Sequence, residues 1–373
     1  MTDAVLALNA GSSSIKFALF AQGATAQPML LFKGQVEGVA TMPQFTAHDA
    51  AGKKLADLGW TTAGAGHHVV LPQLLAWVEA HLGGNRVAAV GHRIVHGGQD
   101  FTAPTRLTSA VISVLDTLTP LAPLHQPNCL EPVRVLMAMR PDLRQVACFD
   151  TAFHHTLPRV ATRFALPREY EAAGVRRYGF HGLSYEYIAR TLRETAPALA
   201  SGRVVAAHLG NGASLCAMQD GVSVDTTMGF TALDGLMMGT RCGSIDAGVV
   251  LYMLQREGLD AKQIEQVLYR QSGLLGVSGI SADMRLLLAS PAETAREAVE
   301  LFVFRVARET AALAASMGGI DGFVFTGGIG EHAAEIRAKV TDALQWLGPL
   351  DIRMIPTNEE AMIAIHTLEC LAQ

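Results

Sequence analysis

Short apolar runs separated by turn residues open the chain. The runs at residues 4–9 and 15–20 flank a turn rich in glycine and serine, a pattern that predicts a hairpin of two β-strands. A helix is predicted at residues 69–82, and a short strand at 87–90 leads into a glycine-flanked turn. Two further strands are predicted before that helix, at residues 30–39 and 44–48.

The same pattern recurs in the second half of the chain. A strand at residues 203–208, a turn at 209–213 and a returning strand at 214–218 repeat the opening hairpin. Each half then continues with a helix and with a strand that ends in glycine, so a tandem duplication into two α/β domains is the economical interpretation. The later elements of the second half are predicted strands at 222–226 and 322–326 and a helix at 292–317.

Glycine, serine and asparagine fill three turns that follow predicted strands, at residues 10–14, 209–213 and 327–330. Such turns expose backbone N–H groups that bind phosphate oxygens. The same residue types also dominate ordinary hairpin turns. Because turns of this kind follow three predicted strands, the interpretation that they bind phosphate is favoured over the interpretation that they are three ordinary turns.

The composition is that of a globular protein with a large core. The 373 residues fit two domains, and the 17% of charged residues is below the usual share of about 25%. A net charge of -5 disfavours binding to nucleic acid. The uncharged stretch at residues 58–78 contains glycines and a proline, so it does not predict a membrane span.

The cysteines and the amino terminus bear on the compartment. The five cysteines are scattered and never form CxxC, which predicts reduced thiols. No basic region precedes the first predicted strand, so no secretory signal is predicted. We therefore expect a cytoplasmic protein.

A nucleotide site is predicted, but not of the P-loop type, because the sequence has no GxxxxGK[ST] motif. Residues 328–333 match GxGxxA after a strand, which is also the pattern of a dinucleotide fingerprint. Because the opening strands are antiparallel hairpins, we interpret this segment as a helix N-terminus that faces a nucleotide phosphate. A dedicated zinc site is not predicted, and Mg²⁺ shared with substrate phosphates suits the Asn, Asp and Glu side chains better.

Arginine and histidine recur beside glycine in several other segments. Each such residue taken singly is ordinarily an interior or surface group, but their recurrence where the backbone can approach a ligand predicts a site for phosphate or carboxylate. These segments are residues 91–98, 149–155, 176–182 and 239–246.

Six motifs in the same order along the chain resemble those of the acetate kinases. Residues 9–16 (NAGSSSIK) and 177–182 (RYGFHG) resemble the two signatures of that family. The other matching segments are residues 208–212 (HLGNG), 239–243 (GTRCG), 325–331 (FTGGIGE) and 356–364 (PTNEEAMIA).

The resemblance implies the fold of the acetate and sugar kinase, actin and chaperone ATPase superfamily. That fold has two duplicated ribonuclease-H-like α/β domains around a central cleft that binds ATP. We expect the amino-terminal domain to comprise residues 1–149 and 361–373, because the last helix of the family returns to it, and the nucleotide-binding domain to comprise 150–360. A homodimer is also implied.

The resemblance assigns roles to individual residues. Arg93 would bind the carboxylate, Asp150 would be the essential acid, and His181 and Arg241 would stabilise the transferring phosphoryl group. Asn9 and Glu359 would lie beside Mg²⁺, for which Mn²⁺ can substitute. The implied acyl pocket consists of Val95, Leu124, Phe180 and Ala232. The implied ATP-binding residues are Lys16, His208, Leu209, Gly210, Asn211, Gly212, Asp283, Met284, Arg285, Gly328, Ile329, Gly330, Glu331 and His332.

The implied reaction needs cations. The terminal phosphate of ATP and a carboxylate repel each other by about 4 kcal/mol at 4 Å and an effective dielectric of about 20. Positive groups from both domains would therefore have to converge on the two anions. A carboxylic acid with a pKa of about 4 is already ionised at neutral pH, so no general base is needed. We expect Asp150 to position Mg²⁺ or an arginine instead.

Several positions depart from the family pattern. Ala232 replaces a usual proline, which predicts a larger acyl pocket that admits propionate, since one methylene discriminates by only about 1–3 kcal/mol. Tyr185 replaces a usual histidine, and Ser244 and Ala247 replace Asp and Pro. The segment between residues 346 and 355 is also shorter than in the family.

Three functions remain open on the sequence. The leading one is a kinase that transfers the phosphoryl group of ATP directly and reversibly to acetate. A kinase of propionate or another short-chain carboxylate is the nearest alternative. A non-enzymatic nucleotide switch of the actin or chaperone type would share the glycine-rich turns but would have no use for Arg93 beside an apolar pocket.

Overall fold

The structure is a computed structural model that describes residues 3–11, 13–22, 27–60 and 66–372. Its contacts divide the chain into unit 1, residues 1–152 and 358–373, and unit 2, residues 153–357. Ser12 of the first motif lies outside the described residues. No helix among the described residues combines the length and apolar character needed to cross a membrane.

The unit boundaries differ by a few residues from those expected at 149/150 and 360/361. Asp150, expected in the second domain, belongs to unit 1, because its backbone N–H donates to the Ile94 carbonyl at 3.0 Å. Glu359, also expected in the second domain, belongs to unit 1, because it begins the last helix, which packs on the unit 1 sheet.

Unit 1 is built on a sheet with the strand order β5-β4-β3-β2-β1-β6-β8-β7. β1 is antiparallel to β2 and parallel to β6, and β6 is parallel to β8. The strands are β1 (Asp3–Ala10), β2 (Ser14–Ala21), β3 (Met29–Glu37), β4 (Gln44–Asp49), β5 (Lys54–Gly59), β6 (Arg86–Ile94), β7 (Thr105–Arg106) and β8 (Arg144–Phe149).

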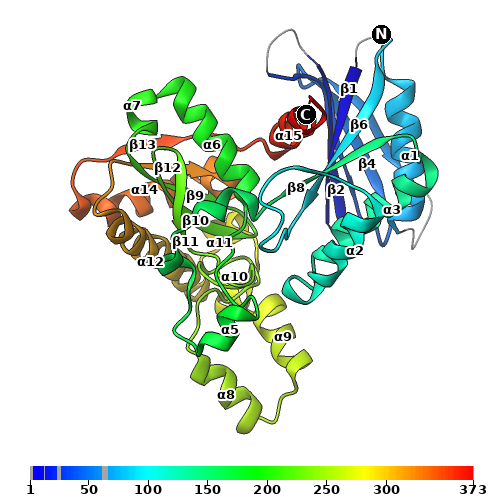
Figure 1. The fold of residues 1–373 in the computed structure, drawn as a ribbon. Coiled ribbons are helices and arrows are strands. Elements are labelled where there is room, and N and C mark those ends of the chain that lie inside the picture. Colours follow the sequence, from blue (N-terminus) through cyan, green and yellow to red (C-terminus); the bar gives the residue numbers. More distant parts are fainter. Residues whose placement is uncertain (1–2, 12, 23–26, 61–65, 373) are drawn as a thin grey trace. The chain divides into compact units, whose positions relative to one another are not determined.

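Helices cover both faces of this sheet, which explains why β1 is buried on both of its sides (Figure 1). Val70 and Leu74 of α1 pack with Leu6 and Phe17 in one core cluster. On the other face α15 approaches so closely that a Cβ at Gly91 of β6 would lie 2.2 Å from the Thr367 hydroxyl. The helices of this unit are α1 (His67–Ala80), α2 (Ser109–Thr117), η1 (Thr119–Leu121), α3 (Gln126–Met139) and α15 (Glu359–Ala372).

Unit 2 is built on a five-stranded sheet with the order β11-β10-β9-β12-β13. α6 and α7 pack against β9, and α12 packs against β9, β10 and β11. The strands are β9 (Arg203–Leu209), β10 (Ala213–Gln219), β11 (Val222–Thr226), β12 (Gly322–Thr326) and β13 (Asp351–Met354).

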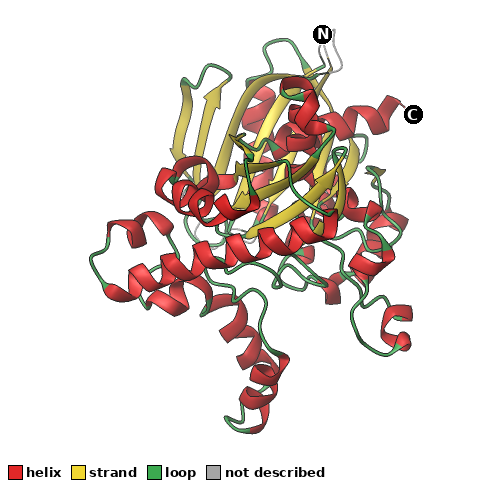
Figure 2. Ribbon diagram, turned by 90° about the vertical axis from the view of Figure 1, so that its left-hand side faces the viewer, coloured by secondary structure: helices red, strands yellow, loops and turns green. Residues whose placement is uncertain are grey.

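Helices make up much of the remainder of unit 2, and Figure 2 shows helices and strands together in this mixed α/β chain. They are α4 (Arg159–Thr162), α5 (Arg168–Ala172), α6 (Gly182–Thr195), α7 (Pro197–Ala200), α8 (Ala247–Gln255), α9 (Ala261–Arg270), α10 (Gly273–Ser278), α11 (Met284–Ala289), α12 (Glu293–Met317), α13 (Gly327–His332), α14 (Ala334–Leu344) and η3 (Gln345–Leu347). The short η2 (Ala152–Thr156) spans the boundary between the units.

The two sheets share one topology. In unit 1 the order β3-β2-β1-β6-β8 has two antiparallel pairs followed by two parallel pairs. In unit 2 the order β11-β10-β9-β12-β13 has the same pairs in the same sequence. The tandem duplication predicted from the hydrophobic pattern is therefore confirmed.

Candidate active site

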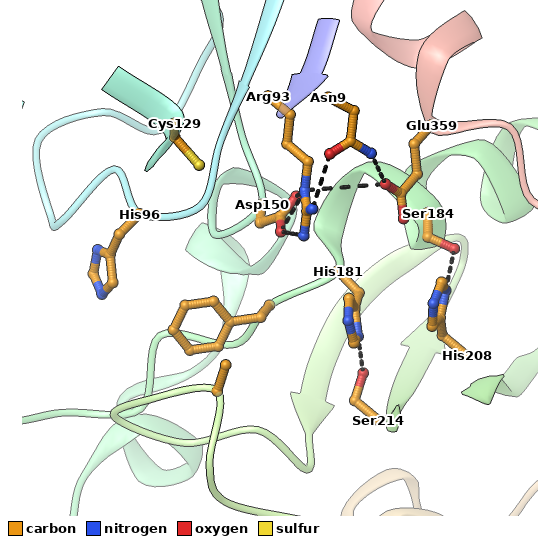
Figure 3. Close-up of polar contacts among 12 residues, drawn as sticks. Asn9, Arg93, His96, Cys129, Asp150, His181, Ser184, His208, Ser214 and Glu359 are labelled. Carbon is orange, nitrogen blue, oxygen red and sulfur yellow. Dashed lines mark hydrogen bonds and ion pairs between the residues drawn. The ribbon is translucent and has the colours of Figure 1, made fainter. Parts of the chain in front are cut away.

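An arginine and an aspartate meet at the carboxyl ends of two neighbouring parallel strands of unit 1. Arg93 is the penultimate residue of β6, and Asp150 directly follows β8. The Arg93 Nε donates to both Asp150 carboxylate oxygens at 3.0 Å, and its Nη2 donates to Oδ2 at 2.5 Å (Figure 3). Asp150 is 1% exposed, so this charge-assisted pair fixes the plane of the guanidinium.

Asn9 and Glu359 complete this cluster from β1 and α15. The Arg93 Nη1 donates to the Asn9 Oδ1 at 3.1 Å, and the Asn9 Nδ2 donates to the Glu359 Oε2 at 3.0 Å (Figure 3). The same Glu359 oxygen lies 4.0 Å from the Arg93 Nε. These contacts use three of the five N–H groups of Arg93. One N–H on each terminal nitrogen has no partner among the described residues.

Burial and the neighbouring charges shift the pKa values of Arg93 and Asp150. Burial alone lowers the pKa of Arg93, but the charges of Asp150 and Glu359 outweigh it and raise that pKa, so the guanidinium stays protonated. Burial raises the pKa of Asp150, and the charge and hydrogen bonds of Arg93 oppose this shift. Asp150 thus accepts hydrogen bonds from Arg93 through both of its carboxylate oxygens.

The oxygen donors of this cluster fit Mg²⁺ that arrives with a nucleotide. Asn9 and Glu359 supply hard oxygen ligands, and Mg²⁺ in proteins typically uses one or two carboxylates together with waters and substrate phosphates. Among the described residues, no group of three or more His, Cys, Asp or Glu side chains is arranged to hold a metal.

A strained histidine lies at the start of α6 in unit 2. His181 has φ 58° and ψ 24°, the left-handed region in which a residue other than glycine costs about 1–2 kcal/mol. Gly179, two residues earlier, also has a positive φ, and a Cβ there would lie 2.6 Å from the His154 ring. His154 in turn bonds the Phe180 carbonyl at 2.9 Å, which fixes the backbone just before His181.

The first turn of α6 meets a cross-strand pair of the sheet. His208 of β9 lies opposite Ser214 of β10 in the strand register. The His181 ring stacks on His208 with centroids 4.3 Å apart, and its Nδ1 lies 2.8 Å from the Ser214 Oγ (Figure 3). Ser184 Oγ lies 2.9 Å from the His208 Nδ1. The two imidazoles are thus held side by side.

Gly212 leaves room for two of the predicted catalytic groups of unit 2. A Cβ at Gly212 would lie 2.9 Å from the Arg241 Nη2 and 3.4 Å from the His181 Nε2. Arg241 is held from its other side, where Nη1 donates to the Ala232 carbonyl at 2.5 Å. Arg241 and His181 therefore approach the same backbone turn after β9.

A pocket of about 480 Å³ lies in unit 2 beside this turn. It brings together three segments that the sequence assigned to ATP binding. Its lining residues are Gly210, Asn211, Ala282, Asp283, Met284, Arg285, Leu288, Gly328, Ile329, His332 and Ala333. The segment 327–330, expected as a glycine-rich turn that leads into a helix N-terminus, is itself the start of the short helix α13.

Other expected ATP residues lie outside the pocket lining. Glu331 does not line the pocket, and its Oε1 accepts from the backbone N–H groups of Gly327 and Thr357 at 3.0 and 3.1 Å. Lys16 lies in unit 1, on β2 opposite Asn9, with its side chain exposed. The remaining expected ATP residues outside the lining are His208, Leu209, Gly212 and Gly330.

The four residues expected around the acyl group divide between the units. Val95 and Leu124 belong to unit 1, and Phe180 and Ala232 belong to unit 2. Val95 and Phe180 are buried, and Leu124 and Ala232 are half-buried.

The sequence assigned no role to three residues that hold the imidazoles. Ser214, Ser184 and Thr357 supply hydroxyls around His181 and His208, and the Thr357 hydroxyl donates to Ser184 at 2.8 Å. Ser214 gave no signal, because a serine after a glycine-rich turn is unremarkable in sequence. The signal for the neighbouring Tyr185 was its departure from the family pattern.

The family model described as "Acetokinase family" matches residues 4–361. An acetate kinase of Rhodopseudomonas palustris (strain TIE-1) is 51% identical, with 98% of each chain covered. An acetate kinase of Methylocella silvestris is 49% identical, with 100% of this chain and 99% of the relative covered.

Solved structures agree. The crystal structure of Porphyromonas gingivalis acetate kinase has a TM-score of 0.87 at 34% identity and covers 99% of this chain and 100% of its own. The crystal structure of a propionate kinase from Francisella tularensis has a TM-score of 0.88 at 35% identity, with 98% of each chain covered. Because the family model and these relatives match nearly the whole length of the chain, the chain belongs to the acetokinase family.

Proposed function

We propose that the protein transfers the γ-phosphoryl group of ATP reversibly to acetate. A carboxylate oxygen of acetate attacks the γ-phosphorus in line, the bond from that phosphorus to the bridging oxygen breaks, and the electron pair leaves with ADP. Acetyl phosphate and ADP are the products, and no proton moves. The braced Arg93, in a chain of this family, is the observation that carries the proposal.

Arg93 suits the carboxylate substrate. Asp150 and Asn9 fix its guanidinium, and one N–H on each terminal nitrogen has no partner among the described residues. Two donors on one rigid plane match the two oxygens of a carboxylate. The residues proposed for the acyl group are Val95, Leu124, Phe180 and Ala232.

Groups of unit 2 suit the nucleotide and the transferring phosphoryl group. The pocket offers apolar side chains such as Met284 and Ile329 for a base, and glycines at residues 210 and 328 that let phosphates approach the backbone. Arg241 and His181 would donate to the phosphoryl oxygens. An arginine in this role contributes on the order of 10³–10⁵ in rate.

Asn9 and Glu359 would hold Mg²⁺, or Mn²⁺ in its place, together with the nucleotide phosphates. Bound there, the metal would neutralise phosphate charge. Because Arg93 contacts both residues, the metal ligands and the carboxylate-binding group are braced by one network.

Trapping the product as a hydroxamate tests the proposal. Wild-type protein with ATP, Mg²⁺, acetate and hydroxylamine is expected to form acetohydroxamate, and omission of any substrate should abolish it. A nucleotide switch would release inorganic phosphate or show no turnover, and it would form no hydroxamate. That result would overturn the proposal.

Ala232 favours a second candidate substrate, propionate. Alanine stands where the family pattern has proline, and its side chain is small and half-buried. We expect kcat/KM for propionate to lie within about tenfold of that for acetate, which is the lower end of the roughly 1–3 kcal/mol that one methylene contributes. An acetate preference above a hundredfold would exclude the enlarged pocket.

We also propose a homodimer in the cytoplasm. Several apolar side chains of α8 are exposed, with Leu251 at 52% and Tyr252 at 55%, and exposed apolar patches mark association surfaces. The five cysteines, all among the described residues, form no disulfide, which suits a reducing compartment.

A further inference from the structure

A chain of hydroxyl groups leads from α6 to the His181 ring. The Tyr185 hydroxyl lies 2.5 Å from the Ser214 Oγ, and this oxygen lies 2.8 Å from the His181 Nδ1. Tyr185 and Ser214 are both 0% exposed, so the hydrogen bond between them is shielded from solvent. Figure 3 shows the last link of the chain, from Ser214 to His181.

The direction of the protons in this chain follows from acidity and from the contacts. A phenol is far more acidic than a serine hydroxyl, so Tyr185 is the donor in a bond as short as 2.5 Å. Burial raises the pKa of Tyr185 well above its usual value, so the phenol keeps its proton. Ser214, which accepts from Tyr185, then has its single proton left for the His181 Nδ1.

We propose that Tyr185, acting through Ser214, holds His181 as the neutral tautomer that carries its proton on Nε2. The Nε2 lies on the side of the ring that faces Gly212 and the Arg241 Nη2. His181 then presents an N–H donor to an anion at this turn without needing a positive charge of its own. Tyr185 is a positioning residue in this account. The consequence for phosphoryl transfer rests on the proposed function, whereas the tautomer does not.

The stacked partner ring is held by a hydroxyl group in the same way. The stacked His208 ring faces His181 with its π-surface, and its Nδ1 lies 2.9 Å from the Ser184 hydroxyl. Ser184 itself accepts a hydrogen bond from the Thr357 hydroxyl. By the same argument Ser184 donates to the His208 Nδ1, so both stacked rings carry their protons on Nε2.

The ring nitrogens report the tautomer directly. In the full chain with ¹⁵N-labelled histidine, His181 is assigned by the loss of its signals in His181→Gln. We expect its Nδ1 to be unprotonated and its Nε2 protonated at pH 7.5. In Tyr185→Phe, Ser214 loses its donor and can accept from an Nδ1–H, so the other tautomer should become detectable. A protonated Nδ1 in the wild type, or an unchanged tautomer in Tyr185→Phe, would overturn the proposal.

A mutant cycle tests the route through Ser214. We expect Tyr185→Phe to lower kcat about tenfold with little change in KM for ATP, since a misdirected donor costs transition-state stabilisation. Ser214→Ala should lower kcat further, and the double variant should match Ser214→Ala alone. Additive losses would show that Tyr185 acts independently of Ser214 and would refute the route.

Thr310→Val is the matched control. It removes an equally buried hydroxyl, which donates to the Val306 carbonyl within α12, far in sequence from the histidines. It should leave both the tautomer and kcat unchanged. If the tautomer is as expected but no acyl phosphate forms, only the proposed function fails. If acyl phosphate forms while the tautomer is wrong, only this inference fails.

Discussion

At the scale of single residues, the positions of the candidate active-site side chains depend on the space that neighbouring residues leave. Gly212 is the clearest case, because the space of its missing side chain is bordered by Arg241 and His181. The sequence predicted these three residues as site members by resemblance. It could not predict that they meet, because they lie on three separate segments.

Gly212→Ala is expected to reduce activity without destabilising the fold. The added Cβ would lie 2.9 Å from the Arg241 Nη2, the far end of a flexible side chain that can move away. We expect kcat to fall at least tenfold, and the thermal unfolding midpoint to change by less than about 2 °C.

Gly59→Ala on the exposed strand β5 is its control, since among the described residues a Cβ there meets only the Gln44 side chain, at 3.5 Å. A Gly212→Ala variant that retains full kcat would show that the position of Arg241 is not critical.

Asp150→Asn should impair use of the carboxylate substrate equally at every pH between 6 and 9. The variant removes the charge that orients Arg93, while acetate, with a pKa of about 4, stays ionised over this range. We expect kcat/KM for acetate to fall at least a hundredfold, with ATP affinity retained because the pocket proposed for the nucleotide lies in unit 2.

Asp116→Asn, which removes the partner of Arg134 on the surface of unit 1, should have no effect on activity. A loss in Asp150→Asn that appeared only as the pH fell would point to a proton-transfer role and contradict this assignment.

At the scale of elements, the repeated β-strand topology is what the hydrophobic pattern predicted best. The opening hairpins of both halves and the helices α1 and α12 form where the apolar periodicity placed them. β8 was missed because its run RQVACF begins with two polar residues, although it carries Asp150 at its end. The Tyr185–Ser214 contact was beyond sequence reasoning, since only the packing of α6 on the sheet brings the two together.

Two buried histidines each form a hydrogen bond between two elements of the same unit. They predict that the folded protein loses stability as the pH falls. His92 of β6 bonds Gln145 of β8, and His154 of η2 bonds Ser223 of β11. Burial lowers the pKa of each from 6.5 to about 4. Between these values the unfolded chain binds more protons than the folded chain, so stability is present above pH 6.5 and is lost as the pH falls towards 4.

Urea unfolding from pH 7 to pH 5 measures this loss. Each histidine should contribute about 1.4 kcal/mol per pH unit below its unfolded pKa. His154→Gln should reduce the slope of the unfolding free energy against pH by the contribution of one proton. A free energy of unfolding that does not change with pH would contradict the assignment of these histidines as neutral in the fold.

At the scale of the whole molecule, the duplication yields two units that carry different groups of the candidate site. Unit 1 carries the braced Arg93 cluster, and unit 2 carries the pocket, Arg241 and the stacked histidines. α8 and α9 extend away from the sheet of unit 2 (Figure 1). The exposed apolar side chains of α8 have no role in either cluster, which suits an association surface.

Light scattering tests the proposed dimer. Wild-type protein should have twice the 39.6 kDa mass of the chain, and Leu251→Glu should shift it towards the monomer, because the charge would be buried on association. Leu55→Glu, at an exposed leucine of β5, is the matched control. A wild-type monomer, or a Leu251→Glu dimer as tight as the wild type, would argue against α8 as the interface.

Oxygen isotope transfer tests the central claim most directly. With [¹⁸O₂]acetate, ATP and Mg²⁺, attack by the carboxylate on the γ-phosphorus should place ¹⁸O in the bridging position of acetyl phosphate, visible as an isotope shift in the ³¹P spectrum. The ADP should contain no ¹⁸O. Inorganic phosphate without ¹⁸O, and no acyl phosphate, would mean that the carboxylate is not the acceptor.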